Sequence, residues 1–308
     1  MTSLAAIIRR DLQQPAPDGL EGLLAALHER YGQALRGVLI YGSCRRDVDI
    51  HSGVVDLLVL VERYRAVLRW PGALANQLLP PNVYFLQVGD SQPVRCKYAL
   101  VSISQFARRC ASRADHYFWA RFTQPCRLLW AADEAALADA LTAARVRAAR
   151  TFCTRFAPMI RQPVDAEGFW TQALAATYRC ELRPESPSNA SRLIAADPGY
   201  WQALTQALAA EPGSALETQG SRFQGQAGRW RSARARIDWR LRQISGKCFN
   251  LARLFKAAGT FSNGIDYITW KVERHSGVRI EPTEQMRRYP RLAAWGLAWR
   301  MWRQGGFR

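Results

Sequence analysis

The chain has 308 residues, 48% of them hydrophobic, which suffices for one large domain or two of ordinary size with a substantial core. Its 43 Lys and Arg against 25 Asp and Glu give a formal net charge of +18, which favours a polyanionic partner: nucleic acid, anionic lipid or a phosphorylated substrate. Seven cysteines without a C-x-x-C pair and four histidines without metal-ligand spacing argue against a disulfide framework or a zinc site, and for free thiols in a reducing compartment.

The first 132 residues have the pattern of a small mixed α/β domain. Apolar residues at helical spacing predict a helix over 19–31. Short apolar runs rich in β-branched and aromatic residues predict five strands, over residues 36–41, 54–61, 82–88, 94–102 and 126–130. The second strand is apolar throughout apart from one acid, which predicts a place in the sheet interior. The Gly-Asp-Ser-Gln-Pro between the third and fourth strands indicates a hairpin.

Beyond residue 132 the chain becomes rich in Ala and Arg with helical periodicity. Helices are predicted over residues 133–160, 167–182, 200–210 and 229–258. Pro, Gly and Ser interrupt this pattern at 183–189 and at 211–228, and we expect the second interruption to be a flexible loop. The predicted organisation is therefore a domain over 1–132, a helical domain over 133–262 and a C-terminal section over 263–308.

A Gly-Ser pair and a lone acid connect the first two predicted strands. The first strand ends in Tyr41-Gly42-Ser43, and Asp56 stands near the head of the second. The chain has no G-x-G-x-x-G, and Ser245-Gly246-Lys247 lacks the first glycine and the final Ser/Thr of a phosphate loop, so both of those nucleotide folds are excluded.

This layout resembles the polymerase-β-like nucleotidyltransferase superfamily. The resemblance implies that Gly-Ser opens a helix whose amides and hydroxyl hold a triphosphate, and that acids on the neighbouring strand hold magnesium. In the usual form that strand begins Asp-x-Asp, whereas here Val54 occupies the first acid's position and Asp56 the second's. A strand-turn-strand with an ordinary buried Asp, or an inactive relative, are alternatives at this point.

One branch of the superfamily has a single acid at this position, and the chain resembles it over about residues 35–185. This is the mitochondrial-type phosphatidate cytidylyltransferase (CDP-diacylglycerol synthase) family, of which the chain looks like a bacterial relative. The matching motifs, in order, are Tyr41-Gly42-Ser43, Val54-Val55-Asp56-Leu57-Leu58, Lys97-Tyr98, Tyr117-x-x-x-Arg121-x-x-x-Pro125 and Glu181-Leu182-Arg183-Pro184-Glu185.

The resemblance implies a Mg²⁺-dependent reaction of CTP with phosphatidate. The implied catalytic residues are Asp56, which would also bind the metal, and Lys97. The implied nucleotide-binding residues are Tyr41, Gly42, Ser43, Lys97 and Arg121. Lys97 as an edge-strand lysine, and Arg121 as a structural partner of Glu181 or Asp115, are the alternatives. A second metal-binding acid has three candidates, Asp47, Asp49 and Asp90.

The sequence of the C-terminal section predicts that this part of the chain contacts a membrane surface. Its sequence places Arg291, Trp295, Trp299 and Trp302 on an amphipathic basic helix, which suits an anionic lipid interface, although packing against the core is an alternative. No run of 18 apolar residues and no signal-peptide core is present. We therefore expect a cytoplasmic protein, peripheral on the inner face of the cell membrane, with no nucleic-acid partner; its oligomeric state is not predicted.

Two other functions compete with the lipid enzyme. The same fold could transfer a nucleotide to RNA, a protein or a small molecule. A basic nucleic-acid-binding module is the third hypothesis, because Arg alternates with aromatic residues over 229–242. In that segment, however, Trp230, Ala233, Ile237 and Leu241 recur at helical spacing, which favours one helix with a solvated basic face.

Overall fold

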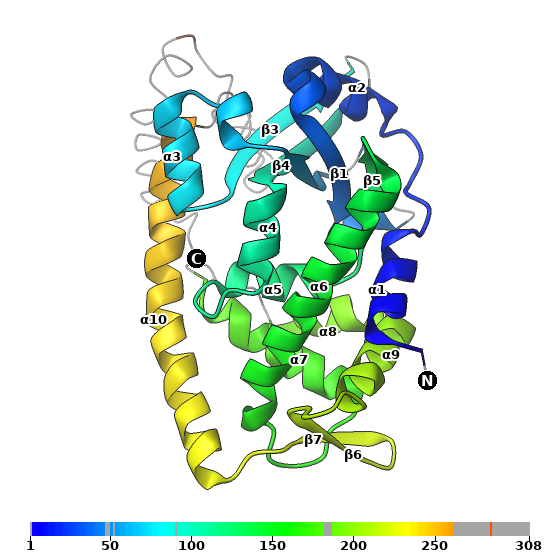
Figure 1. Cartoon of the computed structure of the whole chain (residues 1–308), viewed down its shortest axis with the longest axis vertical. Coiled ribbons are helices and arrows are strands. Elements are labelled where there is room, and N and C mark those ends of the chain that lie inside the picture. Colours follow the sequence, from blue (N-terminus) through cyan, green and yellow to red (C-terminus); the bar gives the residue numbers. More distant parts are fainter. Residues whose placement is uncertain are drawn as a thin grey trace, which may run out of the picture.

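A five-stranded mixed sheet and a surrounding set of helices form the computed structural model, which describes residues 2–46, 50, 51, 53–89, 92–181, 187–260 and 284 (Figure 1). The strands are β1 (Leu35–Tyr41), β2 (Val55–Val61), β3 (Asn82–Val88), β4 (Val94–Ser102) and β5 (Cys126–Ala131), in the order β3-β4-β2-β1-β5. The predicted α/β class, with a small mixed sheet followed by a mostly helical region, is confirmed. All five predicted strands form, and β2 lies at the centre of the sheet.

The pairing of the strands determines which residues meet at their ends. β1 is antiparallel to β2 and β5, β2 is parallel to β4, and β3 and β4 form the predicted hairpin. The register pairs Tyr41 with Asp56 across β1 and β2, and Asp56 with Lys97 across β2 and β4. Three residues that are far apart in the sequence are therefore neighbours in one row.

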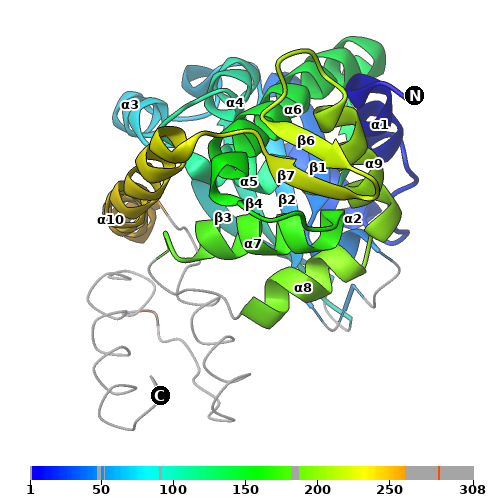
Figure 2. The ribbon, with the colours of Figure 1, turned by 90° about the horizontal axis from the view of Figure 1, so that it is seen from below.

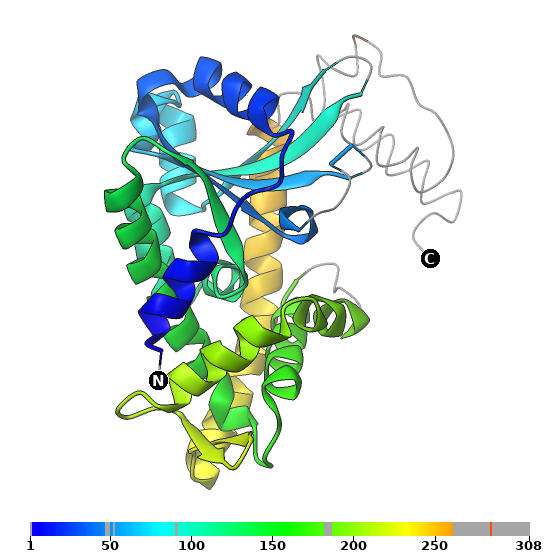
Figure 3. The same cartoon turned by 90° about the vertical axis from the view of Figure 1, so that its right-hand side faces the viewer.

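Helices cover the sheet and extend below it in Figures 1 and 3. They are α1 (Leu4–Leu12), α2 (Glu21–Tyr31), α3 (Trp70–Leu78), α4 (Ile103–Cys110), α5 (His116–Phe122), α6 (Glu134–Phe156), α7 (Ala166–Tyr178), α8 (Pro187–Ala195), α9 (Pro198–Ala209) and α10 (Arg229–Thr260). The sequence patterns predict α2, α6, α7, α9 and α10, and miss five short helices, α1, α3, α4, α5 and α8. Asp133 and Asp165 cap α6 and α7 by accepting from the amides of Ala136 and Gly168.

Two hydrophobic clusters pack on opposite faces of the sheet because side chains alternate along each strand. Leu58 and Leu60 of β2 face a cluster that includes α1, α4, α5, α6, α7 and α9, whereas Leu57 and Val59 face α2. The first cluster continues without a break from Leu4 to Trp239 of α10. The division at residues 132 and 262 stays a prediction.

The segment 211–228, expected to be a flexible loop, contains a β-hairpin, so that expectation is wrong. Its strands are β6 (Leu216–Gln219) and β7 (Arg222–Gly225), with a positive φ of 63° at Gly220 in the turn. Phe223 is buried, and its amide donates to the carbonyl of Val164 at 2.7 Å. Burial of this aromatic ring fixes the hairpin against the helices.

α10 is a single helix, as predicted, but it packs through a different face from the one that the apolar spacing marks. Trp230, Ile237 and Leu241 are 90%, 57% and 59% exposed, whereas Trp239 is buried and its indole donates to the carbonyl of Arg155 at 3.0 Å. A Cβ on Gly246 would lie 2.7 Å from the carbonyl oxygen of Cys180. This glycine therefore permits a close helix contact.

Two predictions from the composition can be compared with the structure. All seven cysteines are free thiols, six buried and Cys248 exposed, as expected. Within the residues that the structure describes, no helix is long and apolar enough to cross a bilayer. The C-terminal prediction for Arg291, Trp295, Trp299 and Trp302 lies outside the described residues.

Candidate active site

The chain turns sharply between β1 and β2 at the Gly-Ser pair. Gly42 has φ 78° and ψ −160°, and residues Ser43–Arg45 then form one turn of 3-10 helix in place of the longer helix that the resemblance implies. A Cβ on residue 42 would lie 3.0 Å from Oδ2 of Asp56. Glycine is therefore suited here for two reasons, its positive φ and the close approach of a carboxylate to its backbone.

Asp56 presents its carboxylate beside this turn. The side chain is 28% exposed, and its Oδ1 lies 3.3 Å from Nζ of Lys97, whose side chain is 39% exposed. That contact has ion-pair distance without hydrogen-bond geometry, and Oδ1 is buried with no hydrogen-bond partner among the described residues. A buried anionic oxygen lacking hydrogen bonds is costly unless a cation or ligand completes its environment.

Arg121 lies on the same side of the sheet, between two aromatic rings. Its Cζ is 5.2 Å from the ring centroid of Tyr41 and 5.3 Å from that of Tyr117. Burial opposes the charge, but the surrounding phenols and the carboxylates of Asp56 and Glu181 outweigh it and raise the pKa of the Arg121 guanidinium. The site therefore holds a permanent cation in cation–π contact with two aromatic rings.

The surroundings of Tyr41 and Asp115 bear on the roles predicted for Tyr41 and Arg121. Burial, followed by the influence of Tyr117 and Asp56, raises the pKa of the Tyr41 phenol well above its ordinary value, so Tyr41 stays neutral. Asp115, one predicted partner of Arg121, pairs with Arg109 at 3.4 Å and Arg253 at 2.7 Å. Tyr117 was not a predicted site residue, although its i,i+4 spacing from Arg121 on α5 is a signal that could have found it.

The Gly-Ser turn is also tied to the helical region. Arg45 is buried and forms an ion pair with Asp197, and Nη1 of Arg46 lies 3.3 Å from the same carboxylate. Asp197 is the N-cap residue of α9. These contacts join residues about 150 positions apart in the sequence, which explains why motif spacing does not reveal them.

The residues present fit a magnesium ion that is held partly by the protein and partly by substrate phosphates. Mg²⁺ usually takes one or two protein carboxylates together with substrate phosphates and water. Asp56 supplies one such ligand, and its buried Oδ1 lacks a hydrogen-bond partner within the described chain. The same residues contain no group of three or more His, Cys, Asp or Glu side chains that could hold a metal by itself. The candidates for a second acid, Asp47, Asp49 and Asp90, lie outside the described residues.

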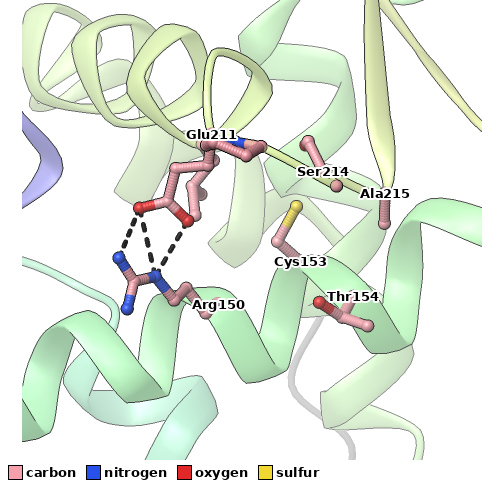
Figure 4. Close-up of a pocket in the computed structure, with 9 residues that line it drawn as sticks. Arg150, Cys153, Thr154, Glu211, Ser214 and Ala215 are labelled. Carbon is pink, nitrogen blue, oxygen red and sulfur yellow. Dashed lines mark hydrogen bonds and ion pairs between the residues drawn. The ribbon is translucent and has the colours of Figure 1, made fainter.

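A separate pocket of about 360 Å³ lies between α6 and the segment that follows α9 (Figure 4). One side of it is occupied by the Arg150 guanidinium, which donates to the carboxylate of Glu211 at 2.7–3.1 Å. None of the predicted site residues lines this pocket. The candidate active site is therefore the group of residues around Asp56 and not this cavity.

Comparison with known proteins identifies no family for the chain. No protein-family model matches it, and no curated protein sequence matches it. A crystal structure of a nucleotidyltransferase-like protein from Exiguobacterium sibiricum 255-15 aligns with 93% of this chain and 92% of that chain, with 14% sequence identity and a TM-score of 0.28. A likeness of this strength carries no argument about fold or function.

Gly42→Ala tests whether the turn geometry matters. The new methyl group would meet the Asp56 carboxylate at 3.0 Å in a backbone conformation with positive φ. We expect the free energy of unfolding to fall by about 1–2 kcal/mol. The free energy of nucleotide binding should weaken by more than this. Gly220→Ala is the control, since it has the same sign of φ with no atoms near its Cβ position. Equal nucleotide binding by both variants would contradict a role for the turn.

Proposed function

We propose that the chain is a nucleotidyltransferase that uses CTP and phosphatidate to make CDP-diacylglycerol and pyrophosphate. The observation that carries this proposal is the convergence of Gly42, Asp56 and Lys97, which the register of β1, β2 and β4 brings together, with Arg121 on the same side. A positive-φ glycine turn, the Asp56 carboxylate and the cations of Lys97 and Arg121 suit a metal–triphosphate substrate better than a nucleobase or a peptide.

The proposed reaction needs little acid–base chemistry. A phosphate oxygen of phosphatidate attacks the α-phosphorus of CTP, a new P–O bond forms, and the bond to the β-phosphate breaks to release pyrophosphate. The attacking phosphate is already ionised at neutral pH, so catalysis depends on positioning and charge neutralisation. This requirement agrees with a site in which Lys97 and Arg121 lie near the carboxylate of Asp56.

Each residue has a defined part in this proposal. Backbone amides of Gly42 and Ser43 and the Ser43 hydroxyl bind the β- and γ-phosphates. Lys97 and Arg121 neutralise the charge on the transferring and attacking phosphates. Asp56 would hold Mg²⁺, which would neutralise negative charge on the phosphate groups. Asp56 also holds the Lys97 ammonium near the Gly42 turn by their 3.3 Å contact.

The lipid acceptor is proposed on the ordered motifs and the charge. The motif set between Tyr41 and Glu185 resembles the phosphatidate cytidylyltransferase family in order and spacing, and the net charge of +18 suits an anionic lipid surface. A peripheral position on the inner face of the cell membrane follows from the same proposal.

A direct assay distinguishes the proposed acceptor from others. Purified full-length protein with Mg²⁺, labelled CTP and phosphatidate in detergent is expected to yield labelled CDP-diacylglycerol. Diacylglycerol, which lacks the attacking phosphate, is the matched control and should give no product. ATP, GTP and UTP in place of CTP test the base. Nucleotide transfer to RNA, protein or a soluble phosphate, with none to phosphatidate, would contradict the lipid proposal and favour another acceptor.

A further inference from the structure

An exposed apolar stripe runs along the outer face of α10. Its members are spaced four and three residues apart and so share one side of the helix; they are Ile237, Leu241, Ile244, Cys248 and Leu251, with Trp230 one heptad earlier. Ile244 is 65% exposed, in contrast to Trp239 on the inner face, which is buried. Soluble proteins seldom leave such a row of large apolar side chains without a partner.

The stripe has a strongly basic border. Six exposed basic residues of α10 lie within or beside it: Arg229, Arg231, Arg234, Arg236, Arg240 and Lys247. The helix contains one acidic residue, Asp238. An apolar face with a cationic border is the composition of a helix that lies in the plane of an anionic bilayer, with apolar side chains among the acyl chains and guanidinium groups at headgroup level.

A neighbouring helix has the same character. Trp70, Leu74 and Leu78 follow one side of α3 and are all exposed. α3 and α10 lie side by side in Figures 1 and 2, and Lys256 of α10 donates to Asn76 Oδ1 at 3.1 Å. Exposed apolar side chains are therefore present on two adjacent helices.

The charge decides between two occupants of this face. A second copy of the chain would place its own basic helix against α10, and Arg234, inside the stripe, would meet like charge. An anionic lipid surface has the opposite sign, and each basic residue near it adds to binding. The charge therefore favours lipid.

We infer that the outer face of α10, with α3 beside it, is a docking surface for an anionic lipid bilayer. The inference rests on the proposed function, because it supplies the position from which a lipid acceptor reaches the site. The inner face of the same helix contacts the site region, where Arg253 stacks on Tyr117 at 4.9 Å and Tyr117 in turn stacks with Arg121. One helix diameter, about 10 Å, separates the two faces.

The test measures binding of the full-length protein to sedimented vesicles of phosphatidylglycerol and phosphatidylcholine. The double variant Leu241→Glu/Ile244→Glu is expected to bind these vesicles roughly 30-fold more weakly than the parent chain. The double variant Arg236→Gln/Arg240→Gln should also bind roughly 30-fold more weakly, and its binding should depend less on salt concentration. Gln206→Glu adds a negative charge on the exposed side of α9 and should leave binding unchanged. Leu241 and Ile244 are exposed, and the other substituted residues are already polar. The midpoint of thermal unfolding should therefore change little in each variant.

Other results would overturn the inference. Binding by the two double variants equal to that of the parent chain would exclude this face as the lipid surface. Dissociation of a dimer by Leu241→Glu/Ile244→Glu, measured by sedimentation without lipid, would assign the face to a second copy. Activity on phosphatidate dispersed in detergent separates this inference from the proposed function. Retained detergent activity with lost vesicle binding supports both, whereas absence of activity in the parent chain would refute the reaction and leave the vesicle result standing.

Discussion

Asp56→Asn is expected to lower the rate of nucleotide transfer by at least roughly 10³-fold while the chain stays folded. The substitution keeps the shape of the side chain and removes a negative charge that lies beside the Gly42 turn and the Lys97 ammonium. An amide oxygen is a weaker ligand for Mg²⁺, and the amide group cannot balance the Lys97 ammonium, which lies 3.3 Å from the carboxylate. The measurement is kcat/KM for CTP at saturating phosphatidate, together with the midpoint of thermal unfolding.

Glu62→Gln is the matched control for that experiment. Glu62 directly follows the end of β2 opposite to Asp56 and pairs on the surface with Arg36 at 2.6 Å. Glu62→Gln therefore removes the same charge as Asp56→Asn at a position remote from the candidate site. We expect activity within about twofold of the parent chain, since an exposed ion pair contributes about 0–1 kcal/mol. Retention of more than a tenth of the activity by Asp56→Asn would refute the role of Asp56.

Arg145→Met is expected to destabilise the fold by about 3–5 kcal/mol. The Arg145 side chain is fully buried and pairs with Asp11 at 2.7 Å. Its guanidinium also donates to the carbonyl oxygens of Ile8, Phe122 and Gln124 and to the hydroxyl of Tyr200, at 3.0–3.3 Å. Removal of the guanidinium leaves a carboxylate and several carbonyl groups buried without their donor. Urea unfolding followed by circular dichroism measures the change.

Arg150→Met on the same helix provides the comparison. Arg150 also pairs bidentately with an acid, Glu211, but its side chain is 54% exposed. We expect this variant to lose about 1 kcal/mol or less, because solvent and salt screen the pair. Equal costs for the two variants would show that burial of Arg145 is not what makes it important. The double variant Asp11→Asn/Arg145→Met should cost less than the sum of the single variants, since both remove one interaction.

The sequence predicts the sheet well because its signals are local. The apolar run of β2 indicates a strand in the sheet interior, so the acid near its start has a neighbouring strand on each side, Tyr41 on β1 and Lys97 on β4. Lys97 stands in register with Asp56 because β4 pairs with β2 in parallel. The motif order of the chain therefore anticipates the juxtaposition of Gly42, Asp56 and Lys97, although their functions stay proposals.

The sequence does not predict which face of α10 is buried. Both faces have regularly spaced apolar residues, so periodicity alone cannot choose between Ile237 and Trp239. The choice depends on Gly246, which allows close contact with Cys180, and on a partner carbonyl for the indole of Trp239. These partners come from distant parts of the chain. Stacking of Arg253 on Tyr117, 136 positions earlier in the sequence, escapes local patterns for the same reason.

The central claim is that phosphatidate attacks the α-phosphorus of CTP at the site around Asp56. Parallel reactions with CTP labelled at the α-phosphorus and at the γ-phosphorus test it most directly. The account predicts that the α label enters the lipid product, that the γ label leaves as pyrophosphate, and that Asp56→Asn abolishes both signals while Glu62→Gln preserves them. Entry of the γ label into lipid, or transfer of the α label that does not depend on Asp56, would contradict it.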